Sequence, residues 1–567
     1  MGRFQRLLAA ASALLTAPAV AHGQPAAPAV EGEWVGTLGP AELHLAVHVR
    51  RAATGLTGTM DSLDQGSMAM PLAAVEAAGG RFVFDVPAVG GHFAGAWDAA
   101  SRAYRGEWTQ QNLHLPLALT QGAAATRPAI AGLDGDWDGV LQLGVMGSLR
   151  LVFHVRSGPG GTVASLESPD QGTGQLPFST FTREGTKVRA EAKAIGARFE
   201  GVLDPAGTTL DGRWTQGGQE KPLVLKRRTS GSSAPAALRR PQTPVPPFPY
   251  RQIEVAFDNA AGHNRLAGTL TVPEGRGPFP AALLITGSGL QDRDETLMGH
   301  KPFLVLADYL SRRGIAVLRV DDRSIGGSTG DPKGTTFDLA TDTEAGLTFL
   351  LTRAEIDRRR IGLVGHSEGG AIAPLVAARN PAAAWIVLLA GPGVPGDRVI
   401  LAQQRLIQAA GGVPQSTIDA NSALQRRLLD VVEAAPTQEA ALAGAKKLLL
   451  ETGMREGAAE GNAAAVSSNW YRTFLKLDPA PALRAVHVPV LALIGSLDLQ
   501  VPAADNIPKL KAALAGNGDA TVVELPGLNH LFQTARTGAI AEYAQIEETI
   551  APVALRTVGD WIASHSK

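Results

Sequence analysis

The chain has 567 residues, of which 45% are hydrophobic and 19% charged, a composition typical of a globular protein with more than one domain. Its formal net charge of −1 gives no electrostatic support for nucleic-acid binding, so no nucleic-acid partner is expected. It contains no cysteine, which excludes disulfides, thiol catalysis, cysteine-ligated metal and a lipid anchor on cysteine.

Residues 1–21 have the pattern of a secretory signal peptide. Arg3 and Arg6 precede an apolar stretch over residues 7–20 that is too short to span a bilayer comfortably. Ala19-Val20-Ala21 offers a cleavage site, and Ala21-His22-Gly23 is the alternative site. An amphipathic or disordered N-terminus is the other interpretation. No later stretch has the pattern of a membrane span, so we expect export to the periplasm or the medium without a stable membrane anchor.

Residues 31–122 and 131–228 repeat one another. The matching positions are Trp34 with Trp137, Asp64 with Asp170, Phe93 with Phe199, Trp108 with Trp214, and Pro116 with Pro222. Each copy contains short alternating segments, such as residues 43–49 and 149–155, which predicts an antiparallel barrel or sandwich. We expect the shared tryptophans and phenylalanines to fill the core of each copy. The alternative is that their rings are exposed and stack on sugars.

Residues 229–250 are predicted to be an extended linker, because five prolines fall between Pro241 and Pro249, and we expect few contacts across it. From residue 251 to 567, apolar strands alternate with helices, which predicts a parallel sheet covered by helices. An alanine- and leucine-rich helical stretch over residues 396–478 interrupts this pattern. We interpret it as a lid that shapes a substrate pocket, and a packing insert without a gating role is the alternative.

Ser367 lies at the centre of Gly365-His366-Ser367-Glu368-Gly369, between an apolar run and a helical segment. A strand, a tight turn and a helix with serine in the turn describe a nucleophile elbow, where glycines permit close backbone packing. A second G-x-S-x-G sequence surrounds Ser328, but Asp331-Pro332 follows it, and proline disfavours helical geometry in the preceding residue. We therefore predict that Ser328 lies in a loop and that Ser367 is the nucleophile.

A serine nucleophile needs a histidine base and a carboxylate that orients this histidine, in the chain order Ser, acid, His. Of the three histidines after Ser367, His487 directly precedes a strand and His565 is close to the C-terminus, whereas His530 follows an apolar strand. Asp498 follows the preceding apolar strand and is the predicted acid. Asp505 is the second candidate, although we expect it to cap the next helix.

The oxyanion formed during acyl transfer needs two preorganised N–H donors. One donor is predicted to be the backbone N–H of Glu368, directly after the nucleophile. The other is expected from the glycine-rich loop after the strand at residues 281–285, with the N–H of Ser288 as the first candidate and Gly289 or Leu290 as alternates.

These motifs resemble those of bacterial α/β-hydrolase carboxylesterases of a type with an N-terminal β-rich extension. The resemblance is carried by Thr286–Glu295, Lys301–Phe303, Arg319–Arg323, the Gly-His-Ser-Glu-Gly-Gly elbow and Leu493–Pro502. It covers about residues 250–567 and implies an α/β-hydrolase fold with a triad of Ser367, Asp498 and His530. It further implies hydrolysis of small, short-acyl esters through an acyl-enzyme, without cofactor or metal.

Relatives of this family include serine aminopeptidases and prolyl-oligopeptidase-like enzymes, so a peptidase is the second hypothesis. It would need a carboxylate that faces a free amine, and Glu295 or Glu368 are the candidates. Thr286 stands where hormone-sensitive-lipase-like esterases have the histidine of His-Gly-Gly-Gly, which argues against that branch. A binding protein with a degenerate hydrolase domain is the third hypothesis, and the intact Ser, Asp and His argue against it.

Overall fold

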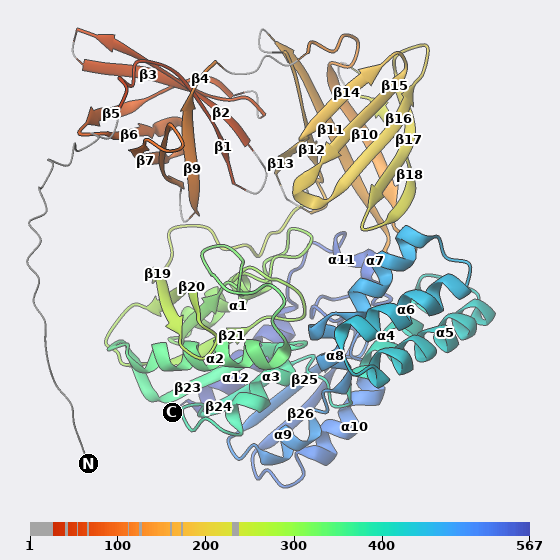
Figure 1. Ribbon diagram of the computed structural model, residues 1–567. Helices are drawn as coiled ribbons and strands as arrows, with labels where there is room; N and C mark the ends of the chain where they lie inside the picture. Colours follow the sequence, from red (N-terminus) through yellow and green to blue (C-terminus); the bar gives the residue numbers. More distant parts are fainter. Residues whose placement is uncertain are drawn as a thin grey trace, which may run out of the picture.

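The computed structural model describes residues 27–39, 43–53, 55–64, 67–110, 113–123, 128–158, 161–171, 174–229 and 238–566. The predicted signal peptide and the start of the linker at residues 230–237 lie outside the described residues. Two β-rich parts lie side by side, and a larger α/β region lies below them in the view of Figure 1. Among the described residues, we find no helix with the length and apolarity that crossing a membrane requires.

The two β-rich parts are nine-stranded antiparallel sheets with the same strand order. The first contains β1 (Gly32–Leu38), β2 (Leu43–Ala52), β3 (Gly55–Ser62), β4 (Ser67–Pro71), β5 (Ala73–Ala78), β6 (Arg81–Val86), β7 (Gly91–Asp98), β8 (Ala103–Gln110) and β9 (Leu113–Gln121). The second contains β10 (Gly135–Gln142), β11 (Ser148–Gly158), β12 (Gly161–Glu167), β13 (Gln175–Pro177), β14 (Thr180–Glu184), β15 (Lys187–Ala192), β16 (Ala197–Leu203), β17 (Thr209–Gln216) and β18 (Gln219–Arg227). The orders are β4-β3-β2-β1-β9-β8-β7-β6-β5 and β13-β12-β11-β10-β18-β17-β16-β15-β14, so each strand of one sheet has a counterpart nine strands later.

The aromatic residues shared by the two copies fill the interiors of these sheets. Trp34 and Trp137 are completely buried, and each donates its indole N–H to a backbone carbonyl four residues earlier. The ring of Trp34 meets that of Tyr104 edge-on, with 5.1 Å between centroids. The prediction that these rings form the core is confirmed, and they present no exposed face for stacking on a sugar.

The C-terminal region is an eight-stranded sheet in the order β19-β20-β22-β21-β23-β24-β25-β26. Its strands are β19 (Tyr250–Asn259), β20 (Asn264–Pro273), β21 (Phe279–Ile285), β22 (Ala316–Val320), β23 (Ile356–His366), β24 (Trp385–Leu389), β25 (Val490–Gly495) and β26 (Ala520–Leu525). Pairing is antiparallel from β19 to β22 and parallel beyond. Every residue of β24 and β25 is buried, which explains their continuous apolar sequences.

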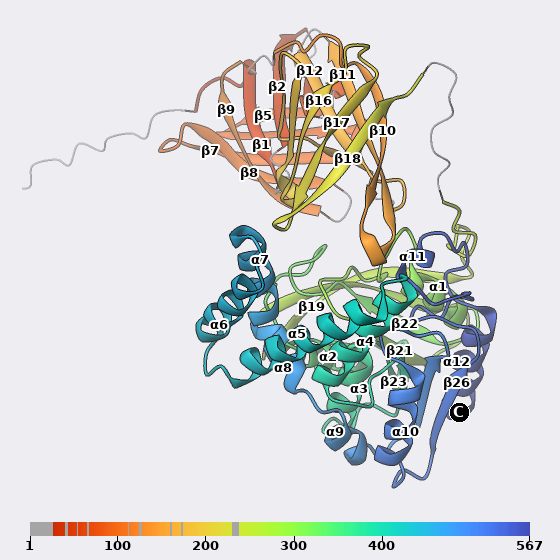
Figure 2. The same ribbon diagram turned by 90° about the vertical axis from the view of Figure 1, so that its right-hand side faces the viewer.

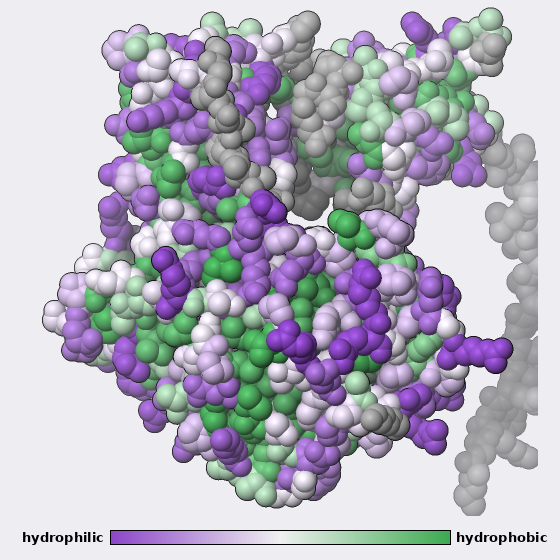
Figure 3. Space-filling model, turned by 180° about the vertical axis from the view of Figure 1, so that it is seen from behind, coloured by the Kyte–Doolittle hydropathy of each residue, from purple (hydrophilic) through white to green (hydrophobic). Residues whose placement is uncertain are grey.

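Helices cover both faces of this sheet, so two cores form. Leu347 of α2, Ile372 of α3 and Leu510 of α10 belong to one core, and Phe303 of α1 and Leu555 of α12 belong to the other. The helices that cover the sheet are α1 (Pro302–Ser311), α2 (Thr336–Leu351), α3 (Gly369–Ala377), α9 (Ala480–Ala485), α10 (Ala503–Ala513) and α12 (Pro552–His565). The short helix α11 (Ile540–Tyr543) packs in a separate small cluster. Seen from behind, the surface mixes hydrophilic and apolar residues over both parts of the molecule (Figure 3).

Six helices lie between β24 and β25, and the first five of them form the insertion that the sequence predicts. These five are α4 (Gly396–Ala410), α5 (Gln415–Ala434), α6 (Gln438–Glu451), α7 (Glu456–Ser467) and α8 (Asn469–Lys476). Ala441 and Ala445 of α6 and Ala459 and Ala463 of α7 are completely buried. The alanine-rich sequence therefore lets these helices approach closely and form a small core of their own.

The linker makes specific contacts with the α/β region. The guanidinium of Arg240 donates hydrogen bonds to the carbonyls of Met298 and Ala544 at 2.7 and 2.8 Å. The turn between β10 and β11 also reaches the α/β region beside α11 (Figure 2), where Val145 packs against a cluster that contains Leu531. The β-rich part is therefore docked through specific contacts, one of which adjoins the loop of His530.

Candidate active site

The backbone around Ser367 forms a sharp turn between β23 and α3. Ser367 has a φ of 53°, in the left-handed region that non-glycine residues rarely adopt. A Cβ on Gly365 would lie 2.0 Å from the carbonyl oxygen of Gly369, and one on Gly369 would lie 2.2 Å from that of Ile285. Both glycines of the motif are therefore required by packing, and the turn has the strained geometry of a nucleophile elbow.

His530 and Asp498 lie in the loops after β26 and β25, and the structure brings them together. Nδ1 of His530 is 2.8 Å from Oδ2 of Asp498, and both side chains are buried. Oδ1 of Asp498 accepts the backbone N–H groups of Gln500 and Val501, each at 2.8 Å. The carboxylate is thus fixed on three sides, and it can hold the imidazole in the tautomer that leaves Nε2 free to accept a proton.

Ser367 and His530 line one cavity of about 300 Å³ between the sheet and the helical insertion. Its walls are formed by Gly287, Ser288, Gln291, Glu295, Leu297, His366, Ser367, Glu368, Pro392, Val399, Ile400, Gln403, Trp470, Phe474, Gln500, Val501, His530 and Leu531. The alternative histidines, His487 and His565, do not line it. Asp505 does not line the cavity either. It lies in the first turn of α10, and Pro502 occupies the N-cap position, so the expectation that Asp505 caps this helix is wrong.

Ser328, at the centre of the second G-x-S-x-G sequence, has a structural role. It is buried in a loop, where its hydroxyl donates to the carbonyl of Asp321 at 2.8 Å and accepts the N–H of Ala267 at 2.9 Å. A hydroxyl that is already committed to two backbone groups, and that lies outside the cavity walls, is not available as a nucleophile. The loop assignment from the sequence is confirmed.

Two of the predicted oxyanion donors face the cavity. Among the described residues, no acceptor is found for the backbone N–H of Ser288 or of Glu368, and both residues line the cavity. Gly287 is excluded as a donor because its N–H is bonded to Oε1 of Glu295 at 2.8 Å. The alternates Gly289 and Leu290 line a neighbouring cavity instead. Ser288 and Glu368 are therefore the pair best placed to donate to an oxyanion beside Ser367.

A sequence model of the alpha/beta hydrolase family matches residues 282–543. This span begins in β21 and includes the elbow, Asp498 and His530. The C-terminal part of the chain therefore contains an α/β-hydrolase domain. Together with the strand order and the preceding pair of antiparallel sheets, this confirms the fold class expected from the sequence.

The chain is similar to esterase EstD of Thermotoga maritima, with 29% identity over 271 residues, 47% of this chain and 58% of that protein. The chain thus spans less than two thirds of that relative. Among solved structures, the α/β hydrolase GrgF of Penicillium sp. sh18 is 16% identical over 56% of this chain and 99% of its own, with a TM-score of 0.38. The Pyrococcus furiosus esterase PF2001 is 14% identical over 56% of this chain and 92% of its own, with a TM-score of 0.35.

One polar pair in the hydrolase domain has a role that sequence reasoning missed. Nδ1 of His366 is 2.9 Å from Oε1 of Glu295, and its Nε2 is 3.0 Å from the carbonyl oxygen of His530. Both ring nitrogens face oxygen atoms that can accept, so a protonated ring can donate to both. Burial alone would lower the pKa of His366, but the Glu295 carboxylate raises it overall. This pair joins the oxyanion loop, the elbow and the His530 loop.

Glu368 joins the elbow to the helical insertion. Its Oε1 accepts the hydroxyl of Thr336 at 2.5 Å and the indole N–H of Trp470 at 2.9 Å, and the Ser288 side chain also hydrogen-bonds to it. Burial raises the pKa of this carboxyl, and these hydrogen bonds offset only part of the rise. The side chain therefore connects the oxyanion loop, α2 and α8 behind the nucleophile.

The Asp321-Asp322-Arg323 sequence braces loops of the hydrolase domain. Asp321 pairs with Arg293 at 2.7 Å, and Asp322 accepts the hydroxyl of Thr286 at 2.7 Å and the N–H of Gln291 at 2.9 Å. Burial raises the pKa of Asp322 to about 7. Within the described part of the chain, no group of three or more His, Asp or Glu side chains is arranged to hold a metal ion.

Proposed function

We propose that the protein is a serine ester hydrolase that acts through an acyl-enzyme at Ser367. The proposal rests on three features that meet in one cavity. They are a serine at a strained elbow, a histidine that is hydrogen-bonded to a buried carboxylate, and two backbone N–H groups for which no acceptor is found among the described residues. Hydroxyl, base and oxyanion donors are the parts that acyl transfer requires. The similarity to an esterase supports the same chemistry.

In this mechanism Nε2 of His530 takes the proton of the Ser367 hydroxyl as Oγ attacks the ester carbonyl. The N–H groups of Ser288 and Glu368 stabilise the resulting oxyanion, and Asp498 stabilises the imidazolium. Collapse of the intermediate breaks the bond to the alcohol, which receives the proton from His530. A water molecule then attacks the acyl-enzyme with His530 as base, and the acid product leaves.

The cavity favours small acyl groups. Its volume of about 300 Å³ lies at the lower end of the range for ligand sites, and Trp470 and Phe474 close one side of it. Each added CH₂ contributes up to about 0.8 kcal/mol only while it finds apolar wall to bury against. We therefore expect kcat/KM to peak at acyl chains of roughly two to six carbons, as measured with p-nitrophenyl esters.

A peptidase that binds a free amino terminus is the weaker candidate. Both carboxylates that line the cavity already accept internal hydrogen bonds, Glu295 from Gly287 and His366, and Glu368 from Thr336 and Trp470. A substrate ammonium group would have to displace one of these donors. Aminoacyl p-nitroanilides should therefore be turned over far more slowly than short esters.

The decisive experiment compares two serines in identical sequence motifs. Ser367→Ala should lower kcat for p-nitrophenyl butyrate by at least about 10³-fold without unfolding the protein, because the hydroxyl does the chemistry. Ser328→Ala is the matched control and should retain turnover. Labelling by an organophosphonate at a peptide without Ser367, or loss of activity only in Ser328→Ala, would refute the proposal.

We further propose that the protein is exported after removal of residues 1–21. The support is the basic, apolar and small-residue pattern at the N-terminus. Protein recovered from the periplasm or medium should begin at His22 or Gln24, as determined by N-terminal sequencing. Cytoplasmic protein that retains Met1 in its native host would contradict this.

A further inference from the structure

A second cavity, of about 580 Å³, adjoins the catalytic one. Its lining includes Ser288, Leu290, Arg323, Lys333, Leu339 and Trp470. Ser288 and Trp470 line both cavities, so these two side chains form a partition between them. The second cavity thus begins directly behind the oxyanion loop and extends beneath α6, α7 and α8.

The partition is held by hydrogen bonds and by ring stacking. The indole N–H of Trp470 lies 2.9 and 3.1 Å from the two oxygens of Glu368, which also bonds the Ser288 side chain. On its other side the indole stacks on Phe474, with centroids 5.6 Å apart and ring planes at 19°. Trp470 is therefore fixed in place, and it sets the limit between the space beside Ser367 and the space beyond.

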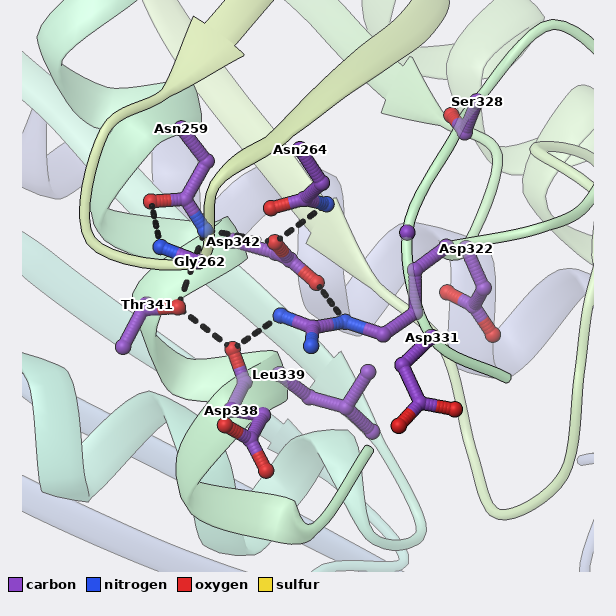
Figure 4. A network of polar contacts seen from close by, with 12 residues as sticks. Asn259, Gly262, Asn264, Asp322, Ser328, Asp331, Asp338, Leu339, Thr341 and Asp342 are labelled. Carbon is purple, nitrogen blue, oxygen red and sulfur yellow. Dashed lines mark hydrogen bonds and ion pairs between the residues drawn. The ribbon is translucent and has the colours of Figure 1, made fainter. Parts of the chain in front are cut away.

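The charge of Arg323 is neutralised within the protein. Its Nε donates to Oδ2 of Asp342 at 2.7 Å, and its Nη2 donates to the carbonyl oxygen of Asp338 at 2.9 Å. Asp342 is held in turn by the side-chain amides of Asn259 and Asn264 (Figure 4). This buried network supports the wall of the second cavity. Because the guanidinium already donates to acceptors within the protein, we do not expect it to bind a ligand.

Lys333 is the charged group that remains available in this cavity. Its side chain is exposed, it forms no ion pair among the described residues, and the cavity walls include no Asp or Glu. Asp331, its near neighbour, accepts the backbone N–H of Lys333. The other walls offer apolar contacts, among them Leu290 and Leu339. The cavity thus combines apolar surface with one positive charge that no described carboxylate balances.

We infer that the second cavity binds the part of the ester remote from the scissile bond, and that this part is an aliphatic segment ending in a carboxylate that pairs with Lys333. The inference rests on the proposed ester hydrolysis at Ser367, and it makes Trp470 the residue that separates the two binding regions. The two cavities together have the size of an ordinary small-molecule site, whereas the catalytic cavity alone suits only a short group.

The test uses esters that differ only at the remote end. One pair is p-nitrophenyl octanoate and mono-p-nitrophenyl octanedioate, which vary the acyl side. The other pair is octyl butyrate and the butyrate of ω-hydroxyoctanoic acid, which vary the alcohol side. In at least one pair, Lys333→Glu should lower the ratio of kcat/KM for the carboxylate-ended ester over its neutral partner by about ten-fold. Lys509→Glu, at an exposed lysine of α10 outside both cavities, should leave that ratio unchanged.

Trp470→Ala provides an independent readout, because it removes the partition. The ratio of kcat/KM for p-nitrophenyl octanoate to that for p-nitrophenyl butyrate should rise in Trp470→Ala. It should rise less in Trp470→Phe, because a ring still divides the two cavities. Circular dichroism checks that both variants fold.

If Lys333→Glu changes neither ratio while the wild type still hydrolyses p-nitrophenyl butyrate, this inference is wrong and the proposed function stands. If butyrate turnover does not depend on Ser367, the proposed function fails instead. In that case, calorimetry with the Ser367→Ala variant tests whether the second cavity binds a carboxylate-ended chain. Tighter binding of octanedioate than of octanoate would support the inference, and equal affinity for the two acids would overturn it.

Discussion

Replacing Glu295 by glutamine removes one charge of a buried ion pair and leaves the shape of the side chain intact. The Glu295 and His366 side chains are both more than nine-tenths buried and lie 2.9 Å apart. A neutral amide at this position can still accept the N–H of Gly287, but it no longer balances the imidazolium. His366 then releases a proton, and one of its two hydrogen bonds, to the amide or to the carbonyl of His530, is lost.

Removing one partner of a buried pair costs about 3–5 kcal/mol, and we expect the lower end because His366 can become neutral. The free energy of unfolding in urea measures this loss. Since His366 also holds the backbone of His530, kcat for p-nitrophenyl butyrate should fall by up to about 10²-fold through displacement of the base. Glu344→Gln is the matched control, because Glu344 pairs with Arg379 at the surface and should change stability by less than about 1 kcal/mol.

The pH dependence separates this reasoning from a general loss of packing. The pKa of His366 is raised in the folded protein, so the pair contributes fully below the unfolded histidine pKa of about 6.5, and its contribution is lost as pH rises through the raised value. The stability gap between wild type and Glu295→Gln should therefore narrow with rising pH. A gap below about 1 kcal/mol at pH 6, or one that does not vary with pH, would refute the charged pair.

Asp498→Asn should keep the fold but lower kcat by about 10³–10⁴-fold, because an amide stabilises the wrong tautomer of His530, and kcat near the pH optimum checks this. The pKa of Asp322 is raised to about 7 in the folded protein, so this carboxyl ionises at lower pH in the unfolded chain than in the folded one. The free energy of unfolding should therefore fall as pH rises from about 4 to 7. Asp322→Asn should remove that slope and stabilise the protein at pH 8 by at most about 4 kcal/mol in urea titrations. Val145→Asp should destabilise the docked turn by about 1–3 kcal/mol and lower kcat through Leu531, whereas unchanged turnover would show that the β-rich part is passive.

The residues that we propose as nucleophile, acid and base could be picked out from the sequence because each depends on local signals. The elbow is a contiguous motif, and Asp498 and His530 each follow an apolar strand in the expected chain order. The Glu295–His366 pair and the Trp470–Glu368 contact were not predictable in the same way, because they join residues 71 and 102 positions apart. Sequence spacing carries no information about such pairs until the topology is known, and buried polar side chains of this kind give no periodic pattern.

The contacts of the linker were also not predictable from the sequence. A proline-rich composition predicts an extended chain, and it does so without indicating what that chain lies against. Arg240 is bound by backbone carbonyls, which can belong to any residue type, so no sequence feature of the hydrolase domain marks its binding site.

The turn between β10 and β11 is one place where the second β-rich sheet packs against the hydrolase domain. A Cβ on Gly147 would lie 2.9 Å from that of Ala541, so the fit at this junction leaves no room for a larger residue. Exchange of the second β unit for one from a related enzyme would therefore succeed only if this turn kept its length and its small residue. The β-rich part is therefore fitted to this hydrolase domain at the turn and is not freely interchangeable.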